Sequence, residues 1–154
     1  MHAPSISRLA HDRHFAAALA AAPVAWIALA AALNVPPNPA WILADPVRAL
    51  SLVVAWPLLE EALFRGGIQP ALLRTSWGAR EAWGVTTANV AASVLFALAH
   101  LATQAPEWVA AAFAPSLVFG HFRDRYGSIA PGAALHVFYN AGYFLLVAPR
   151  PLPA

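Results

Sequence analysis

Hydrophobic residues gather in five long segments of the chain, separated by short polar or proline-rich stretches. A helix of about 20 apolar residues crosses the hydrocarbon core of a bilayer. The first, third and fifth segments have about this length, and the fourth is somewhat shorter. The second is longer and contains Pro57 and the pair Gly66-Gly67, so we expect one long helix that kinks at one of these points. The pattern predicts an all-α fold, a transmembrane helical bundle of about five spans. The segments cover residues 15–33, 46–74, 83–102, 108–122 and 128–147.

Composition supports a membrane environment. Hydrophobic residues make up 60% of the chain and charged residues 10%, against roughly 45–50% and about 25% in soluble domains. The chain has no cysteine, which excludes disulfides, a thiol nucleophile and a cysteine-based zinc site. Its arginines are scattered and form no basic run, so we expect the lipid bilayer as a partner and no nucleic acid.

The arginines predict the orientation of the bundle. With five spans and the N-terminus inside, six arginines lie on the cytoplasmic side and two outside, which fits the positive-inside rule. We therefore expect an N-in, C-out multi-pass protein of the plasma or bacterial inner membrane, with residues 1–14 as a cytoplasmic tail and residues 15–150 as one transmembrane domain. The inner arginines are Arg8, Arg13, Arg74, Arg80, Arg123 and Arg125, and the outer ones are Arg48 and Arg150.

Two features concern the ends of the spans. A signal peptide is the alternative for the first segment, but an apolar core of about 19 residues exceeds the usual 7–15 and favours a retained span. Tryptophans at predicted span ends are typical of the membrane interface, and the sequence His121-Phe-Arg123-Asp124-Arg125 predicts a basic anchor at the inner end of the fourth span. The tryptophans are Trp41, Trp77, Trp83 and Trp108.

An acidic pair and an arginine interrupt the second apolar segment. Glu61 and Arg65 are four residues apart, so they share a helix face and can form an ion pair. Glu60 is turned about 100° away from Glu61. This asymmetry predicts that Glu61 holds Arg65 in place while Glu60 projects into a cavity as a general base. The alternative is that both glutamates form a buried ion network with Arg65.

A polar stripe in the third segment ends in a histidine. Thr86, Asn89, Ser93, Phe96 and His100 recur every three or four residues, which places them on one face of a helix. We expect this face to point into the protein. A buried imidazole bonded to a backbone carbonyl is the alternative to a catalytic His100.

His136 and Asn140 share a face of the fifth segment, with Tyr143 one turn further along. Two hydrogen-bonding side chains on one face can bind a developing oxyanion. They can equally bond to each other and hold helices together.

Helix lengths decide whether these groups reach a common depth. If the second helix extends to Arg74, Glu60 lies about 21 Å from its inner end, at 1.5 Å per residue. On the same basis His100 lies about 25 Å from its inner end, and His136 and Asn140 lie about 12 and 18 Å from theirs. A helix that stopped at Gly66 would place Glu60 only about 9 Å in, so a shared site requires the longer helix.

Three motifs occur in order on these segments: EExxxR as Glu60-Glu61-Ala-Leu-Phe-Arg65, FxxxH as Phe96-Ala-Leu-Ala-His100, and HxxxN as His136-Val-Phe-Tyr-Asn140. In these motifs the chain resembles the CPBP intramembrane proteases, also called Abi-type proteins, which include CAAX prenyl endopeptidases and bacteriocin-processing proteins. The resemblance covers about residues 45–147.

The resemblance implies a glutamic-type intramembrane endopeptidase without a cofactor. Glu60 with His100 would activate a water, His136 with Asn140 would stabilise the oxyanion, and Glu61 and Arg65 would have supporting roles. The implied substrate is a membrane protein or a lipidated or tagged peptide. The small size and the absence of lysine look bacterial, which favours C-terminal sorting tags over CAAX sequences.

Other chemistries remain as alternatives. Glu60, His100 and His136 also form a possible His₂Glu zinc set, and a membrane binding or immunity protein on the same scaffold needs no catalysis. A serine protease built on Ser93 or Ser116 is disfavoured, because the sequence has no GxSxG motif and no lysine.

Overall fold

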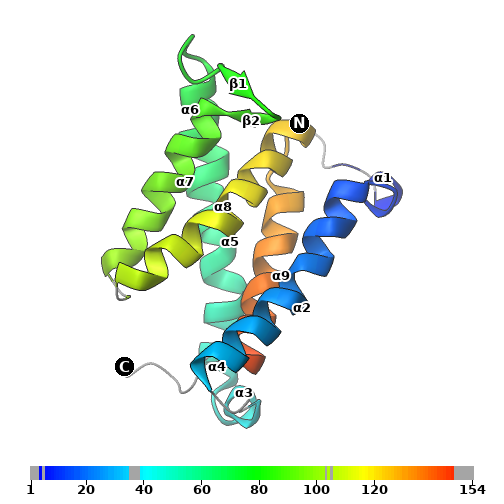
Figure 1. The fold of residues 1–154 in the computed structure, drawn as a ribbon, viewed down its shortest axis with the longest axis vertical. Coiled ribbons are helices and arrows are strands. Elements are labelled where there is room, and N and C mark those ends of the chain that lie inside the picture. Colours follow the sequence, from blue (N-terminus) through cyan, green and yellow to red (C-terminus); the bar gives the residue numbers. More distant parts are fainter. Residues whose placement is uncertain (1–3, 5, 35–38, 103, 105, 148–154) are drawn as a thin grey trace. The chain divides into compact units, whose positions relative to one another are not determined.

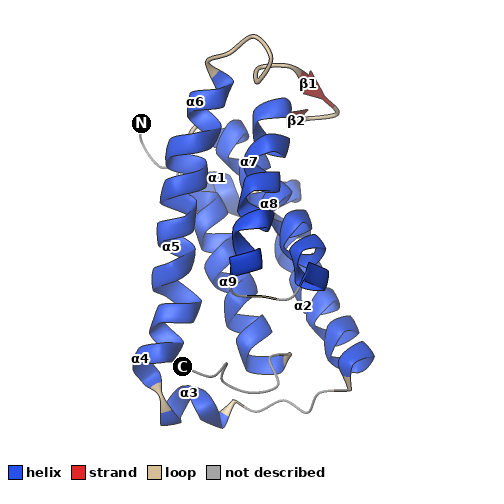
Figure 2. Cartoon of the chain, turned by 90° about the vertical axis from the view of Figure 1, so that its left-hand side faces the viewer, coloured by secondary structure: helices blue, strands red, loops and turns tan. Residues whose placement is uncertain are grey.

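The computed structural model describes residues 4, 6–34, 39–102, 104 and 106–147, and in them the all-α prediction is confirmed (Figure 1). One short antiparallel hairpin, β1 (Glu81–Ala82) with β2 (Val85–Thr86), joins α6 to α7 (Figure 2). The helices are α1 (Ile6–Ala10), α2 (Arg13–Leu33), α3 (Ala40–Ala44), α4 (Pro46–Leu50), α5 (Trp56–Glu61), α6 (Gln69–Leu73), α7 (Thr87–Ala99), α8 (Pro106–Tyr126) and α9 (Ala130–Leu146), with π-helical segments η1 (Ser51–Ala55) and η2 (Ala62–Ile68) and the 3₁₀ turn η3 (His100–Ala102).

The chain divides into two compact units. The first unit is built mainly from Leu59–Ala134 and contains the EExxxR and FxxxH motifs, and within it α7 packs along α8. The second unit contains Ile6–Leu58 and the greater part of α9, from Leu135 onward, with the HxxxN motif.

The second helix has the length that the sequence predicts. The elements α4, η1, α5, η2 and α6 follow one another without a break, and Arg74 is the C-cap residue. At the other end Asp45 accepts a hydrogen bond from the N–H of Arg48 at 3.0 Å, and Pro46 occupies the first turn, where its missing N–H costs nothing.

Two prolines explain the π-helical segments. In η1 the N–H of Trp56 reaches back five residues to the carbonyl of Ser51. The next donor in this wider turn would be Pro57, which has no N–H, so the carbonyl of Leu52 lacks its backbone partner. The side-chain amide of Asn140 donates to that carbonyl at 3.1 Å. This contact lies within the second unit.

The same arrangement recurs in the first unit. The N–H of Gln69 reaches the carbonyl of Phe64, and Pro70 then leaves the carbonyl of Arg65 without a backbone donor. Arg123 donates its Nε to this carbonyl at 2.9 Å. The two places at which the sequence predicts a kink, Pro57 and the pair Gly66-Gly67, thus lie just after and within a widened turn, respectively. The carbonyls left without a backbone donor bind side chains.

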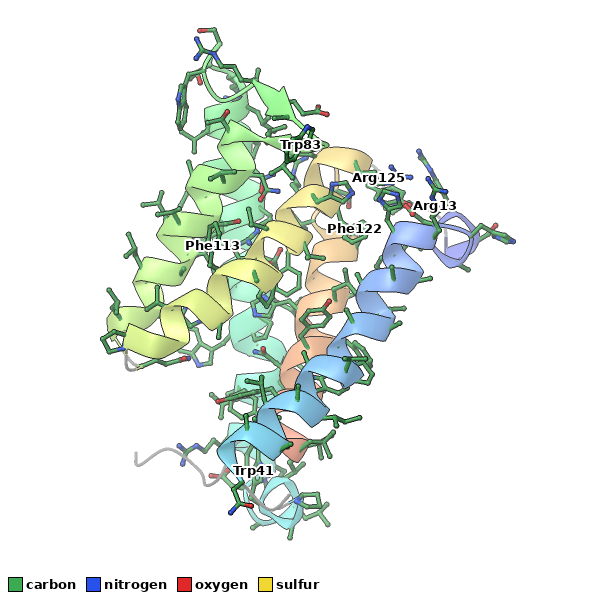
Figure 3. All side chains as sticks on the ribbon, viewed as in Figure 1. Arg13, Trp41, Trp83, Phe113, Phe122 and Arg125 are labelled. Carbon is green, nitrogen blue, oxygen red and sulfur yellow. The ribbon has the colours of Figure 1, made fainter. Side chains whose placement is uncertain are left out.

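The third segment begins later than predicted. The expected start at Trp83 is wrong, because residues 81–86 form the hairpin and α7 begins at Thr87. Thr86 is the N-cap of α7 and accepts a hydrogen bond from the N–H of Asn89 at 3.0 Å. Trp83 instead occupies the tip of the hairpin (Figure 3).

The remaining apolar segments are helical, as predicted. By length and apolar character, Arg13–Ala32 in α2 is a candidate membrane span among the described residues, and Thr87–Ala102 is a shorter apolar helix. The count of five spans and the N-in orientation stay predictions, and Arg150 and the side chain of Trp108 lie outside what the structure describes. Trp41, predicted at the interface, is buried in the second unit and donates its Nε1 to the carbonyl of Phe144 at 2.9 Å.

Candidate active site

The polar stripe on α7 faces the interior of the first unit, as predicted. Asn89 and Ser93 are fully buried, Phe96 and the N-cap Thr86 are buried, and His100 is half-buried at the end of the helix. The hydroxyl of Ser93 donates to the side-chain oxygen of Asn89 at 3.1 Å. The side-chain nitrogen of Asn89 donates to the carbonyl of Leu117 on α8 at 3.0 Å, so the polar face of α7 forms a contact between helices.

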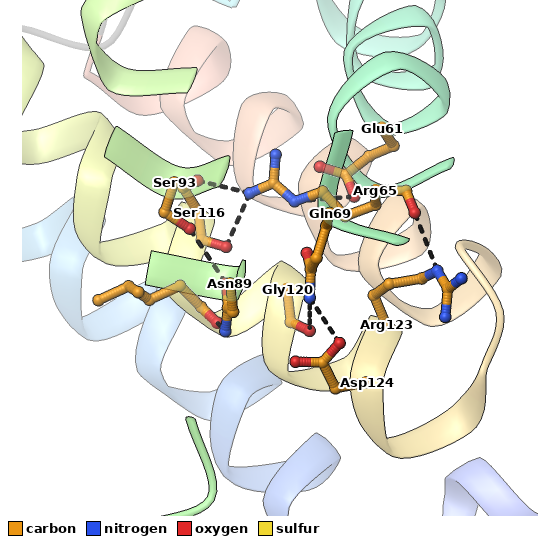
Figure 4. Close-up of polar contacts among 10 residues, drawn as sticks. Glu61, Arg65, Gln69, Asn89, Ser93, Ser116, Gly120, Arg123 and Asp124 are labelled. Atoms are coloured by element: carbon orange, nitrogen blue, oxygen red, sulfur yellow. Dashed lines mark hydrogen bonds and ion pairs between the residues drawn. The ribbon is translucent and has the colours of Figure 1, made fainter. Parts of the chain in front are cut away.

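Arg65 is the central buried charge of the first unit (Figure 4). Its Nε lies 3.7 Å from Oε2 of Glu61, and both side chains have no exposed surface. This ion pair is the one that the four-residue spacing predicts, but it is too long for a hydrogen bond. The closer partner is Ser116 of α8, whose backbone carbonyl accepts from Nη2 at 2.7 Å and whose hydroxyl accepts from the same nitrogen.

Phe96 connects the arginine to the histidine. The guanidinium carbon of Arg65 lies 4.9 Å from the centre of the Phe96 ring, which is the geometry of a cation–π contact. The imidazole of His100 also packs on the Phe96 ring, with ring centres 4.6 Å apart. The ring of Phe64 meets the Phe96 ring edge-on, with ring centres 5.2 Å apart. The phenylalanine of the FxxxH motif therefore fixes the position of two motif residues.

The backbone sets the tautomer of His100. Its Nδ1 lies 2.9 Å from the carbonyl oxygen of Phe96. A carbonyl only accepts hydrogen bonds, so Nδ1 must donate, and in the neutral ring Nε2 then carries the lone pair. The backbone contact considered as an alternative role for His100 is thus present, and it prepares Nε2 to accept a proton or a hydrogen bond from water.

The two glutamates differ in environment. Glu61 is fully buried, whereas Glu60 is half-buried. A Cβ added to Gly132, in the first turn of α9, would lie 3.1 Å from Oε2 of Glu61, so the carboxylate rests directly on this backbone. The positive end of the helix dipole at an N-terminus stabilises a carboxylate there. Glu61 therefore has two sources of neutralisation, Arg65 and the start of α9.

The predicted basic anchor at the end of α8 has a different role in part. Arg123 is buried and donates a hydrogen bond to the carbonyl of Arg65. Asp124 accepts hydrogen bonds from Gln69 Nε2 at 2.7 Å and from the hydroxyl of Thr86 at 2.7 Å. Both residues therefore help to pack the first unit. Around Asp124 of α8, polar side chains meet from α6 (Gln69) and from the N-cap of α7 (Thr86). Arg125 remains exposed.

Gly120 leaves space for the buried side chains of Asn89 and Gln69, because it has no side chain of its own. The carbonyl of Gly120 accepts from Gln69 Nε2 at 3.0 Å. A Cβ at this position would overlap the side-chain amide of Asn89 and come within 2.9 Å of Gln69 Oε1. We therefore expect Gly120→Ala to lower the free energy of unfolding by about 1–3 kcal/mol, the usual cost of overpacking, measured by thermal unfolding in detergent.

A matched glycine provides the control. At Gly67 a Cβ would meet only the carbonyl oxygen of Ala62, at 3.9 Å, which is an ordinary contact. Gly67→Ala should leave the melting temperature unchanged or raise it, since alanine favours helix. An equal loss of stability in both variants would contradict the packing argument at Gly120.

The HxxxN residues lie in the second unit. His136 is buried and Asn140 is half-buried. Asn140 uses one amide hydrogen on the carbonyl of Leu52, so it holds α9 to η1, as the helix-joining alternative predicts. Its amide carries a second hydrogen and an oxygen, which leaves an oxyanion role chemically open.

Comparison with known proteins identifies the family. Residues 40–142 match the family model described as type II CAAX prenyl endopeptidase, Rce1-like, and this match covers more than half of the chain and all three motifs. The chain belongs to this family. Rce1-like proteins are membrane-integral helical proteases that act on membrane-associated substrates, so the resemblance drawn from the motifs is confirmed. No curated protein and no solved structure is similar enough to count as a match.

Family membership gives the Rce1-like chain a protease scaffold and leaves its metal dependence to experiment. In the part of the chain that the structure describes, no three histidine, aspartate or glutamate side chains are grouped so as to hold a metal ion. The zinc site of Glu60, His100 and His136 stays an untested alternative.

Proposed function

We propose that the chain is a glutamic-type intramembrane endopeptidase that cleaves near the C-terminus of membrane-anchored proteins. The observation that carries the proposal is the order of the three motifs inside the region matched by the Rce1-like family. Each motif supplies a residue type that peptide hydrolysis requires: a carboxylate base, an imidazole and an amide donor.

In this mechanism the water molecule donates one hydrogen bond to Nε2 of His100, which holds it in place. Glu60 takes the other proton of this water. The resulting hydroxide attacks the scissile carbonyl carbon, and the negative charge moves to the carbonyl oxygen. His136 and Asn140 donate hydrogen bonds to this oxyanion. The protonated Glu60 then returns its proton to the leaving amine as the C–N bond breaks.

Two observations support this division of labour. Glu61 is fully buried, paired with Arg65 and in contact with Gly132, so its charge is already compensated. Glu60 is half-buried and is therefore the carboxylate better placed to meet water. The His100 tautomer, with Nδ1 on the Phe96 carbonyl, leaves the nitrogen that the mechanism needs. Glu61 and Arg65 act as supporting residues.

The substrate class is tested by co-expression. We would express the chain in a bacterial membrane with two reporters, one ending in a C-terminal sorting tag and one anchored by a prenylated CAAX sequence, and find the cut by mass spectrometry. Cleavage near the C-terminus of either reporter supports the proposal, and the reporter that is cut distinguishes the two substrates. If both remain intact beside correctly inserted chain, the proposed substrate class is wrong.

The catalytic water is activated without a metal in this proposal. We expect the purified protease to keep its full activity after treatment with a strong zinc chelator, because a glutamate base requires no metal ion. The measurement is the initial rate of peptide cleavage before and after chelation. Loss of activity that added zinc restores would establish the His₂Glu zinc mechanism instead.

A further inference from the structure

The hairpin between α6 and α7 presents a fully exposed tryptophan. Ala82 and Val85 pair across its end, so Trp83 and Gly84 form a two-residue turn. The Trp83 side chain is 102% exposed, and Trp77 in the same connection is 47% exposed. Large aromatic side chains are seldom left wholly in water. We therefore expect the Trp83 side chain to contact something outside this chain.

The backbone of Trp83 is strained for a bulky residue. Its φ is +54° and that of Gly84 is +78°, and positive φ at both central positions is the signature of a type I′ turn. This turn favours Asn-Gly, because asparagine tolerates the left-handed conformation and bulky residues do not. The turn alone thus disfavours tryptophan here, which points to a role for its side chain outside the hairpin.

The hairpin is fastened to the first unit. The N–H groups of Thr87 and Ala88 donate to the carbonyls of Arg80 and Gly78 at 2.8 and 3.0 Å. Nδ1 of His121, on α8, lies 3.0 Å from the carbonyl oxygen of Gly84. These contacts hold the turn, so Trp83 projects from a fixed platform (Figure 3).

The connection that carries the turn, and the end of α8 that contacts it, are basic. Arg74 and Arg80 are exposed in the connection, and Arg125, one helical turn beyond His121 on α8, is also exposed. Glu81 is the exposed carboxylate of the hairpin. Aromatic rings with arginines match the headgroup region of a membrane, where tryptophan prefers the interface and arginine binds anionic lipid.

We propose that the Trp83 hairpin is an anchor that inserts into the anionic headgroup layer of the membrane. Trp83 enters the interface, and Arg74, Arg80 and Arg125 bind the lipid phosphates around it. The anchor fixes the end of α7 opposite to His100. The proposal rests on the family's membrane location and is independent of the catalytic mechanism.

The absence of cysteine from the chain allows a single label to test the anchor. Ala82→Cys, exposed beside Trp83, would receive a nitroxide in the full chain, reconstituted in phosphatidylcholine liposomes with or without phosphatidylglycerol. We expect the label to be shielded from a water-soluble relaxation agent, more strongly with phosphatidylglycerol. Adding Trp83→Asn should remove the shielding, while Glu81→Gln, one position from the label, should retain or increase it.

Stability separates anchoring from folding. Because asparagine suits the turn, Trp83→Asn should keep or raise the melting temperature in detergent while it loses membrane contact. A label that is open to water with Trp83 present overturns the proposal. So does shielding that Trp83→Asn leaves unchanged, or a lower melting temperature in this variant, which would mean that Trp83 serves the fold.

Discussion

We expect Glu60→Gln to abolish peptide cleavage while the chain stays folded. Glutamine has the size and hydrogen-bonding capacity of glutamate but cannot accept the proton of the attacking water. General-base catalysis contributes about 10²–10⁴-fold to a rate, so kcat should fall by at least about 100-fold. Because Glu60 is half-buried, the melting temperature should change little. The measurements are initial rates in proteoliposomes and thermal unfolding.

The control for this variant is Glu81→Gln, the same chemical change at an exposed glutamate of the hairpin, which should leave kcat unaltered. If the chain were a membrane binding or immunity protein without catalytic activity, Glu60→Gln would retain full biological activity. That outcome, with the chain intact in the membrane, would exclude Glu60 as the base.

Arg65→Met is expected to have the largest effect on stability. Arg65 is fully buried, pairs with Glu61, donates to Ser116 and stacks on Phe96. Removing one partner of a buried ion pair leaves an uncompensated charge and costs about 3–5 kcal/mol. We expect a loss of this size in the free energy of unfolding in detergent, with cleavage impaired because Phe96 and His100 lose their support.

A second substitution tests the reason. In the double variant Glu61→Gln/Arg65→Met the buried carboxylate is also gone, so part of the lost stability should return. Arg80→Met, at an exposed arginine, should cost no more than about 0.5 kcal/mol. If Arg65→Met were as stable as Arg80→Met, the pairing of Arg65 with Glu61 would not stabilise the first unit.

The helices of this chain were predictable because the apolar pattern and the end signals are local. Asp45-Pro46 marks the start of the long helix and Arg74 its end, and both agree with the structure. The three- to four-residue recurrence along α7 also predicted correctly which face is buried. The Glu61–Arg65 ion pair followed from a spacing of four.

What the sequence did not predict depends on contacts between distant residues. Ser116, the closest partner of Arg65, is 51 positions away from it, and no local pattern marks that pairing. The sequence predicts only a surface anchor at Arg123, because its hydrogen bond to the carbonyl of Arg65 pairs residues 58 positions apart.

The hairpin was missed for another reason. Its strands have two residues each, and the Trp-Gly turn lacks the asparagine or aspartate that usually signals a type I′ turn.

The most direct test of the proposed function is the cleavage of one membrane-anchored peptide by the purified chain in liposomes, with the products identified by mass spectrometry. The proposed function predicts that the wild-type chain cuts a single bond near the C-terminus, in the presence of a chelator, and that Glu60→Gln leaves the same peptide whole. Equal cleavage by the two proteins would contradict it, as would wild-type chain that binds the peptide and never cuts it.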